Sequence, residues 1–239
     1  MNAIQKRHET EIEALVEASV RLGREGFVTS HGGNLSCRAA DGAVLITPTK
    51  QPKESMAFDD IVVVDLEGGV LFAAPGRRPT GETPMHLNLF KKRPDIKGIV
   101  HSHPPALTGF AIAGSDLLSK PLLPEVVIEV GPVLAVDYAA PLSDALAAAF
   151  DKVLARSNAF LMRSHGVMVC AREGVGRALE FTEMLEAMAK SLAVAHGLGN
   201  VDVLAPEALD ELERVLKTRG LGLPGAPGAV KSLRELYRP

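Results

Sequence analysis

Segments with helical spacing of apolar residues alternate with short apolar runs along most of the chain, and this alternation restricts the fold more than any other feature. Helices are predicted over residues 9–24, 83–94, 141–157 and 174–199. Strands are predicted over residues 43–49, 59–72, 98–103 and 158–171. Residues 59–72 are expected to form two strands joined by a tight turn at 67–69, and residues 158–171 two strands broken at 164–166. Thr83 and Ser143 are expected to cap the second and third helices. The mixture predicts an α/β protein with helices layered on a mixed sheet.

Composition and charge exclude several classes of protein. The formal net charge is −3 and no basic run is long, so a nucleic-acid partner is not expected. No stretch approaches the roughly 18 apolar residues that a membrane span needs, and the acidic N-terminal segment is unlike a signal peptide. Only Cys37 and Cys170 are present, which predicts a reducing, cytoplasmic location without a disulfide framework. A single domain over residues 1–239 is expected, with residues 221–239 as an ordered or partner-bound tail.

The stretch GIVHSHPP places two histidines at the end of a predicted strand. Residues two apart on a strand point to the same face, so His101 and His103 are expected to project together. The double proline ends the strand and releases the chain into a loop. Two imidazoles on one face can share an ion. The alternative is a pair of core histidines with satisfied hydrogen bonds.

A third histidine and a carboxylate favour a metal site. His165 falls at the predicted strand break, followed by a glycine that allows a sharp turn. Three histidines with one open position are what a catalytic zinc or a similar divalent ion requires. Glu82, directly before the predicted helix, is the candidate fourth ligand or acid/base. The alternative role for Glu82 is to complement the helix dipole. His86, one turn later, either orients Glu82 or packs inside.

Two further segments are candidate anion sites. Residues 29–38 combine two glycines with the hydroxyls and amide of Thr29, Ser36 and Asn34, which can donate to phosphate or carboxylate oxygens. Residues 47–50 offer a similar turn that ends in Lys50. Read alone, both segments are also ordinary turns.

Taken together and in this order, the motifs GGNLS, ITPT, PTGE, HSH and SHG resemble the class II aldolase/adducin N-terminal family. The resemblance extends from about residue 14 to residue 220. It implies a three-layer α/β/α sandwich with a central mixed, largely antiparallel sheet. It also implies a homotetramer whose active sites lie between subunits.

The resemblance assigns roles to individual residues. It implies that His101, His103 and His165 bind one divalent ion, zinc first with manganese or cobalt as alternatives. It implies that Glu82 ligates the ion at rest and moves a proton in turnover. The family's phosphate-binding positions correspond to Asn34 and Thr49, with Thr80 in the place of a serine.

Departures from the family pattern bear on the substrate. Lys50 stands where sugar-phosphate aldolases have glycine, which leaves phosphate and carboxylate substrates open, and Gly81 replaces a small hydroxyl residue. No tyrosine lies between residues 117 and 131, where the aldolases have a proton donor. Tyr237 in the tail is a candidate replacement that reaches a neighbouring subunit, and His31 is a candidate donor in the anion loop.

The expected function is therefore that of a metal-dependent carbon–carbon lyase. The first hypothesis is a class II aldolase of carbohydrate metabolism that cleaves a small hydroxy-ketone, such as a sugar phosphate, through a metal-stabilised enediolate. The alternative is a decarboxylase of a small hydroxylated acid, since loss of carbon dioxide gives the same kind of enediolate. A 4-epimerase and a non-catalytic, adducin-like interaction domain come after these.

Overall fold

The computed structural model describes residues 2–238 and contains one sheet of eight strands within that range. The strands are β1 (Asn34–Arg38), β2 (Val44–Ile46), β3 (Val62–Val64), β4 (Val70–Phe72), β5 (Gly98–Ser102), β6 (Val133–Val136), β7 (Ala159–Met162) and β8 (Gly166–Ala171). Their order in the sheet is β4-β3-β2-β1-β5-β8-β7-β6, and all neighbours are antiparallel except β6 and β7. The prediction of a mixed, largely antiparallel sheet is confirmed.

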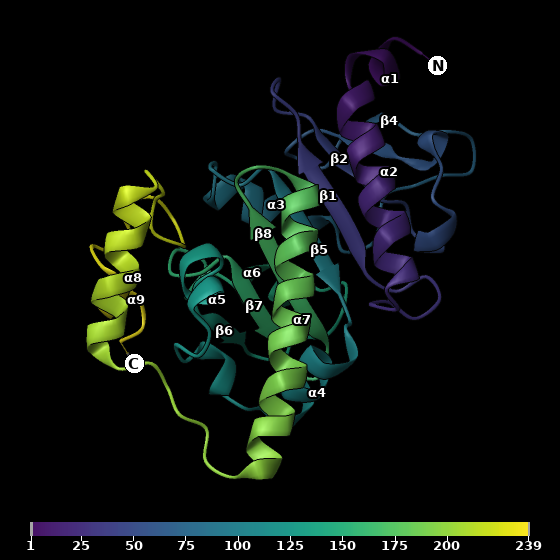
Figure 1. The fold of residues 1–239 in the computed structure, drawn as a ribbon. Helices are drawn as coiled ribbons and strands as arrows, with labels where there is room; N and C mark the ends of the chain where they lie inside the picture. The colour runs from purple at the N-terminus through teal and green to yellow at the C-terminus, as the bar shows by residue number, and fades with distance from the viewer. Residues whose placement is uncertain (1, 239) are drawn as a thin grey trace.

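Helices cover both faces of this sheet (Figure 1). They are α1 (Ala3–Arg7), α2 (Glu9–Arg24), α3 (Thr83–Lys92), α4 (Pro105–Ala113), α5 (Pro124–Glu129), α6 (Asp144–Ala148), α7 (Val175–Leu198), α8 (Pro206–Thr218) and α9 (Leu233–Leu236). Short 3₁₀ turns occur at Lys53–Ser55, Phe58–Asp60 and Leu117–Ser119. No helix in the described part of the chain is long and apolar enough to span a membrane.

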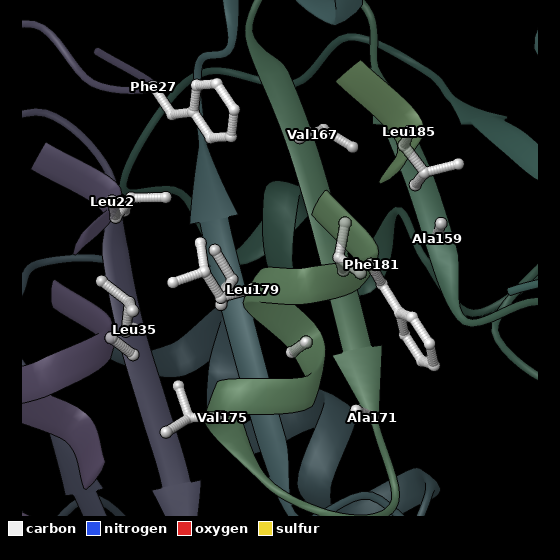
Figure 2. Packing of buried hydrophobic residues seen from close by; sticks show 14 of the residues in the cluster. Leu22, Phe27, Leu35, Ala159, Val167, Ala171, Val175, Leu179, Phe181 and Leu185 are labelled. Atoms are coloured by element: carbon white, nitrogen blue, oxygen red, sulfur yellow. The ribbon is translucent and has the colours of Figure 1, made fainter. Parts of the chain in front are cut away.

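Two apolar clusters hold the three layers together. On one face α2 and α7 pack against the sheet, and Figure 2 shows Val175 and Leu179 of α7 close to Leu35 of β1. On the other face α3 and the segment around Phe150 pack against the alternate side chains of the same strands. Because successive residues of a strand point to opposite faces, β2, β5, β7 and β8 each contribute to both clusters, whereas β1 contributes apolar side chains to the first cluster alone. The predicted α/β/α arrangement is confirmed.

The α3 face positions the polar residues described below. In β1, Leu35 and Cys37 pack under α2 and α7, which leaves Asn34 and Ser36 on the α3 face. In β5, Ile99 belongs to the α3 cluster, so His101 also lies on that face. Asn34 of β1 is paired directly with His101 of β5. Two chain segments more than 60 residues apart in sequence thus meet at one end of the sheet.

Several local predictions need correction. The helix expected over residues 141–157 covers only Asp144–Ala148, because the following backbone hydrogen bonds mostly join residues three apart. Ser143 does cap it, accepting from the Leu146 N–H, whereas Glu82 rather than Thr83 is the N-cap residue of α3. The strand expected over residues 43–49 is reduced to Val44–Ile46. Asn34–Arg38 is a strand, although it was expected to be a loop.

The C-terminal segment packs on its own chain. Leu233 and Leu236 of α9 form a small apolar cluster with α8 and Val127 of α5. The Arg172 guanidinium donates to backbone carbonyls of this segment, and that of Arg156 donates to the carbonyls of Leu236 and Arg238. Residues 221–238 are thus fastened to the sheet layer. The assignment of residues 1–239 to one domain stays a prediction.

Candidate metal and catalytic site

Three histidine side chains converge at the end of the sheet where β5 stops. His101 is fully buried in β5, and His103 follows the strand, its backbone N–H donating to the Phe27 carbonyl at 2.8 Å. His165 lies in the tight turn between β7 and β8, beside Ser164, whose φ is +54°. The ring centroids of the three are 4.8 to 5.4 Å apart. One ring nitrogen from each lies within 4.8 Å of the others.

The three rings have nitrogen atoms that no described residue satisfies. His101 Nδ1 is 3.0 Å from the Val167 carbonyl, which can only accept, so Nδ1 carries the proton and Nε2 is bare. His101 Nε2, His103 Nε2 and His165 Nδ1 are buried without a hydrogen-bond partner within residues 2–238. A buried nitrogen without a partner costs about 1 to 3 kcal/mol, which a bound cation would recover. The donor set therefore fits a divalent ion.

Burial keeps the imidazoles of His101 and His103 neutral. The pKa of His101 is held well below its usual 6.5 by burial and by the neighbouring His103 and His165. Burial, with His165 beside it, also lowers the pKa of His103. Neutral imidazole is the form that binds metals, so His101 and His103 are in the protonation state that a ligand needs.

Glu82 faces the same point from the start of α3. Its Oε2 atom lies 3.4 Å from His101 Nε2, and its Oε1 atom lies 3.7 Å from His165 Nε2. The Asn34 Nδ2 group donates to Oε2 at 2.7 Å. The carboxylate is only 8% exposed, so it is shielded from water yet open on the side of the histidines.

A cleft of about 520 Å³ opens beside this group. Its walls are residues 31–34, 48–50 and 78–82, together with His103, Leu142 and His165. The segments 48–50 and 78–82 are joined by an isolated antiparallel bridge between Pro48 and Pro79. The Thr49 N–H donates to the Arg78 carbonyl at 3.1 Å, which brings the two segments together.

The structure brings most of the predicted substrate-binding residues to this cleft. His31, Asn34, Thr49, Lys50, Thr80 and Gly81 all line it. Tyr237 does not. It packs against the cluster formed by α8 and α9, where burial raises the pKa of its hydroxyl. Its predicted reach into a neighbouring subunit remains a prediction. Ser36 was one candidate donor to an anion, but it does not line the cleft, and its buried hydroxyl bonds to His86.

Two cleft residues were missed by the sequence analysis. Arg78 lines the cleft with Lys50, and neither cation has an ion-pair partner among residues 2–238, whereas the adjacent Arg77 is paired with Asp60. The pair Arg77 and Arg78 directly before the PTGE motif could have indicated a cation beside the cleft. Leu142 has a φ of +66°, and a Cβ at Gly81 would lie 2.7 Å from its Cδ2 atom. Glycine at position 81 thus leaves room for Leu142, and no sequence pattern predicts this contact.

Comparisons with known proteins agree with this geometry. Residues 13–193 match the family described as the Class II Aldolase and Adducin N-terminal domain. The 3-oxo-tetronate 4-phosphate decarboxylase of Haemophilus influenzae is 34% identical over 190 residues, which cover 76% of this chain and 88% of that protein.

Solved structures show the same similarity. The crystal structure of YgbL from Klebsiella pneumoniae has a TM-score of 0.78 and 31% identity, covering 86% of this chain and 98% of that one. L-fuculose 1-phosphate aldolase has a TM-score of 0.77 and 26% identity, covering 87% of this chain and 96% of that one.

Proposed function

The chain belongs to the class II aldolase and adducin N-terminal domain family, and from this premise we propose that it is a divalent-metal-dependent lyase that removes carbon dioxide from a small phosphorylated 3-oxo acid. The observation that carries the proposal is the similarity to a 3-oxo-tetronate 4-phosphate decarboxylase over 88% of that protein. The sequence analysis placed an aldolase first. This relative moves the alternative, the decarboxylase, ahead of it.

We assign the metal to His101, His103 and His165, with Glu82 as a further ligand at rest. Zinc is the first choice because three imidazoles with an open position suit it, and manganese or cobalt are alternatives. A divalent ion held there supplies Lewis-acid stabilisation of the enediolate that forms as the carbon–carbon bond breaks. The unpartnered buried nitrogens of the three rings support this assignment.

Glu82 is the proposed proton carrier. When carbon dioxide leaves, the electron pair of the broken bond stays on the carbon left behind, and that carbon must take up one proton. Glu82 lines the cleft and its Oε1 atom is turned toward His165, which supports the proposal that it acts as the general acid. Each turnover consumes one proton, which Glu82 must regain from solvent.

Lys50 and Arg78 are the proposed partners of the substrate's anionic groups. Both cations line the cleft and are without a carboxylate partner in the described range. Thr49, Thr80 and Asn34 add hydrogen-bond donors. A φ of +60° at Lys50 is a conformation that costs a non-glycine residue about 1 to 3 kcal/mol, and such strain is typically retained where a side chain has a functional role.

An aldolase that releases an aldehyde from a sugar phosphate is the second candidate. It is favoured by the 26% identity to L-fuculose 1-phosphate aldolase over 96% of that chain. The absence of a tyrosine between residues 117 and 131 favours the decarboxylase, because departing carbon dioxide needs no proton donor. For either reaction we propose a cytoplasmic homotetramer with sites between subunits, as the family resemblance implies.

In the deciding experiment, 3-oxo-tetronate 4-phosphate is incubated with metal-replete protein. Release of carbon dioxide and formation of dihydroxyacetone phosphate are then measured. We expect release that stops when a chelator is added and that is lost in His101→Ala. Absence of carbon dioxide, combined with aldehyde release from L-fuculose 1-phosphate, would replace the decarboxylase by the aldolase. The Gly176→Ala variant is the matched control, since an added Cβ there meets nothing within 4 Å.

A further inference from the structure

A chain of buried hydrogen bonds runs behind Glu82 and ends on its carboxylate. We propose that His86 is a positioning residue that acts through Asn34, with Ser36 behind it, to fix the orientation of the Glu82 carboxylate. The inference rests on the proposed function, in which Glu82 is the proton carrier. In this proposal Asn34 orients the Glu82 carboxylate, in addition to making the phosphate contact that the family resemblance implies.

The geometry of the chain follows from two elements. Asn34 and Ser36 are two residues apart in β1 and therefore share the α3 face. Glu82 and His86 are four residues apart at the start of α3 and therefore share a helix face. Ser36 Oγ lies 2.7 Å from His86 Nδ1, and His86 Nε2 lies 2.5 Å from Asn34 Oδ1. Asn34 Nδ2 lies 2.7 Å from Glu82 Oε2.

The direction of every hydrogen bond is fixed by the carboxylate. An ionised carboxylate only accepts, so Asn34 must turn its NH₂ group toward Glu82 and its carbonyl oxygen toward His86. His86 Nε2 must then carry the proton, which leaves Nδ1 bare to accept from the Ser36 hydroxyl. All three donors thus point toward Glu82. Burial, with His101 beside it, lowers the pKa of His86 to about 3, which is consistent with a neutral ring in this one tautomer.

His86 differs from the three candidate metal ligands in the hydrogen bonding of its ring nitrogens. His101, His103 and His165 each keep a buried ring nitrogen without a partner, whereas both nitrogens of His86 are occupied. His86 is fully buried and does not line the cleft. It therefore has no nitrogen left for an ion and no direct access to a substrate, so any effect on turnover must pass through Asn34.

The chain holds one carboxylate oxygen and leaves the other for chemistry. Oε2 is tied to Asn34, while Oε1 is turned toward His165 and the cleft. Without His86 the Asn34 carbonyl oxygen would be buried without a donor, and the amide would be free to rotate away from Glu82. A displacement of about 1 Å in a catalytic group can cost on the order of a hundredfold in rate.

The test compares His86→Leu, which removes both hydrogen bonds, with His86→Gln, whose amide can accept from Ser36 and donate to Asn34. For His86→Leu we expect unchanged metal content, KM within about threefold of the wild type, and kcat reduced roughly ten- to a hundredfold. We expect His86→Gln to recover most of kcat. An equal loss of kcat in both variants would overturn the inference. A loss of metal from His86→Leu, or a rise in its KM as large as the fall in its kcat, would overturn it as well.

A second measurement needs neither substrate nor a folded leucine variant. Nitrogen-15 spectra of the histidines in metal-free wild-type protein at pH 7 should show His86 as the neutral Nε2–H tautomer. The Ser36→Ala variant should shift its Nδ1 signal. An Nδ1–H tautomer, or no response to Ser36→Ala, would overturn the inference even if no substrate is found. Failure of the wild type to turn over substrate would instead count against the proposed function.

Discussion

Substituting Gly166 by alanine is predicted to disturb the candidate metal site through the His103 ring and the adjoining β5 backbone. Gly166 begins β8, and a Cβ added there would lie 2.5 Å from His103 Cδ2 and 2.5 Å from the Ser102 carbonyl oxygen. The Ser102 carbonyl belongs to β5, whose pairing with β8 holds the backbone in place. The His103 ring can move away from the added methyl group, whereas relief of the Ser102 contact requires a shift of the paired β5 and β8 backbones.

The size of the movement follows from ordinary contact distances. Carbon atoms pack at about 3.5 to 4.0 Å, so the His103 ring has to shift by roughly 1 Å. Metal–ligand distances tolerate only about 0.2 Å. Loss of a well-placed supporting group typically costs 10- to 100-fold in metal affinity, and we expect Gly166→Ala to lose at least about that much. Overpacking also predicts about 1 to 3 kcal/mol of lost stability in the metal-free protein.

Metal affinity is measured by titrating metal-free protein with zinc in the presence of a competing chelator. Urea unfolding of the metal-free protein separately measures the change in its free energy of unfolding. Gly176→Ala, where the added methyl meets no atom within 4 Å, should match the wild type in metal affinity. Wild-type zinc affinity in Gly166→Ala would refute the reasoning, because it would mean that the position of His103 does not matter for binding.

Four further outcomes are expected. Glu82→Gln should retain metal bound by the three histidines while kcat for decarboxylation falls about 10²- to 10⁴-fold, and a loss of metal as complete as in His101→Ala would contradict the assigned role. Lys50→Gly should raise KM for the phosphorylated substrate, and an unchanged KM argues against the anion contact. The relieved strain of about 1 to 3 kcal/mol, less roughly 1 kcal/mol for the extra conformational entropy of glycine, should add up to about 2 kcal/mol of stability by urea unfolding. Arg93→Met should lose about 3 kcal/mol in the same assay, because buried Arg93 bonds to Asp95 and to backbone carbonyls, and a loss under about 1 kcal/mol would disagree. Stability of the metal-free protein should fall as pH drops from 6.5 toward 3, because unfolded His86 binds a proton that the folded ring, with its pKa lowered to about 3, does not; His101 and His103, whose pKa values are also lowered, act in the same direction. The share of His86 is up to about 1.4 kcal/mol per pH unit, so His86→Gln should reduce the slope by about that amount, and an unchanged slope would contradict this.

Features that depend on short stretches of sequence were accessible without the structure. The helix over residues 9–24 agrees with Glu9–Arg24 because its apolar spacing is local and strong. The histidines at 101, 103 and 165 could be grouped because a strand end and a tight turn are both recognisable from proline and glycine positions. The α/β/α sandwich followed from the family resemblance and is confirmed by the sheet order.

Features that depend on how distant segments meet were not accessible. The chain from Ser36 through His86 to Asn34 requires β1 to face the first turn of α3, and about fifty residues separate these segments. Arg78 reaches the cleft because of the bridge between Pro48 and Pro79, which no local pattern encodes. Lys50 and Leu142 adopt positive φ values, although the sequence alone would favour glycine at such positions.

The central claim, that this chain uses a histidine-bound ion and Glu82 to form and protonate an enediolate, is tested most directly by proton exchange. Dihydroxyacetone phosphate is incubated in D₂O with protein of known metal content, and loss of the exchanging methylene signal is followed by proton NMR. We predict exchange that stops on chelation, returns when zinc or manganese is added, and is lost in Glu82→Gln. No exchange from protein that carries one ion per chain would contradict the account.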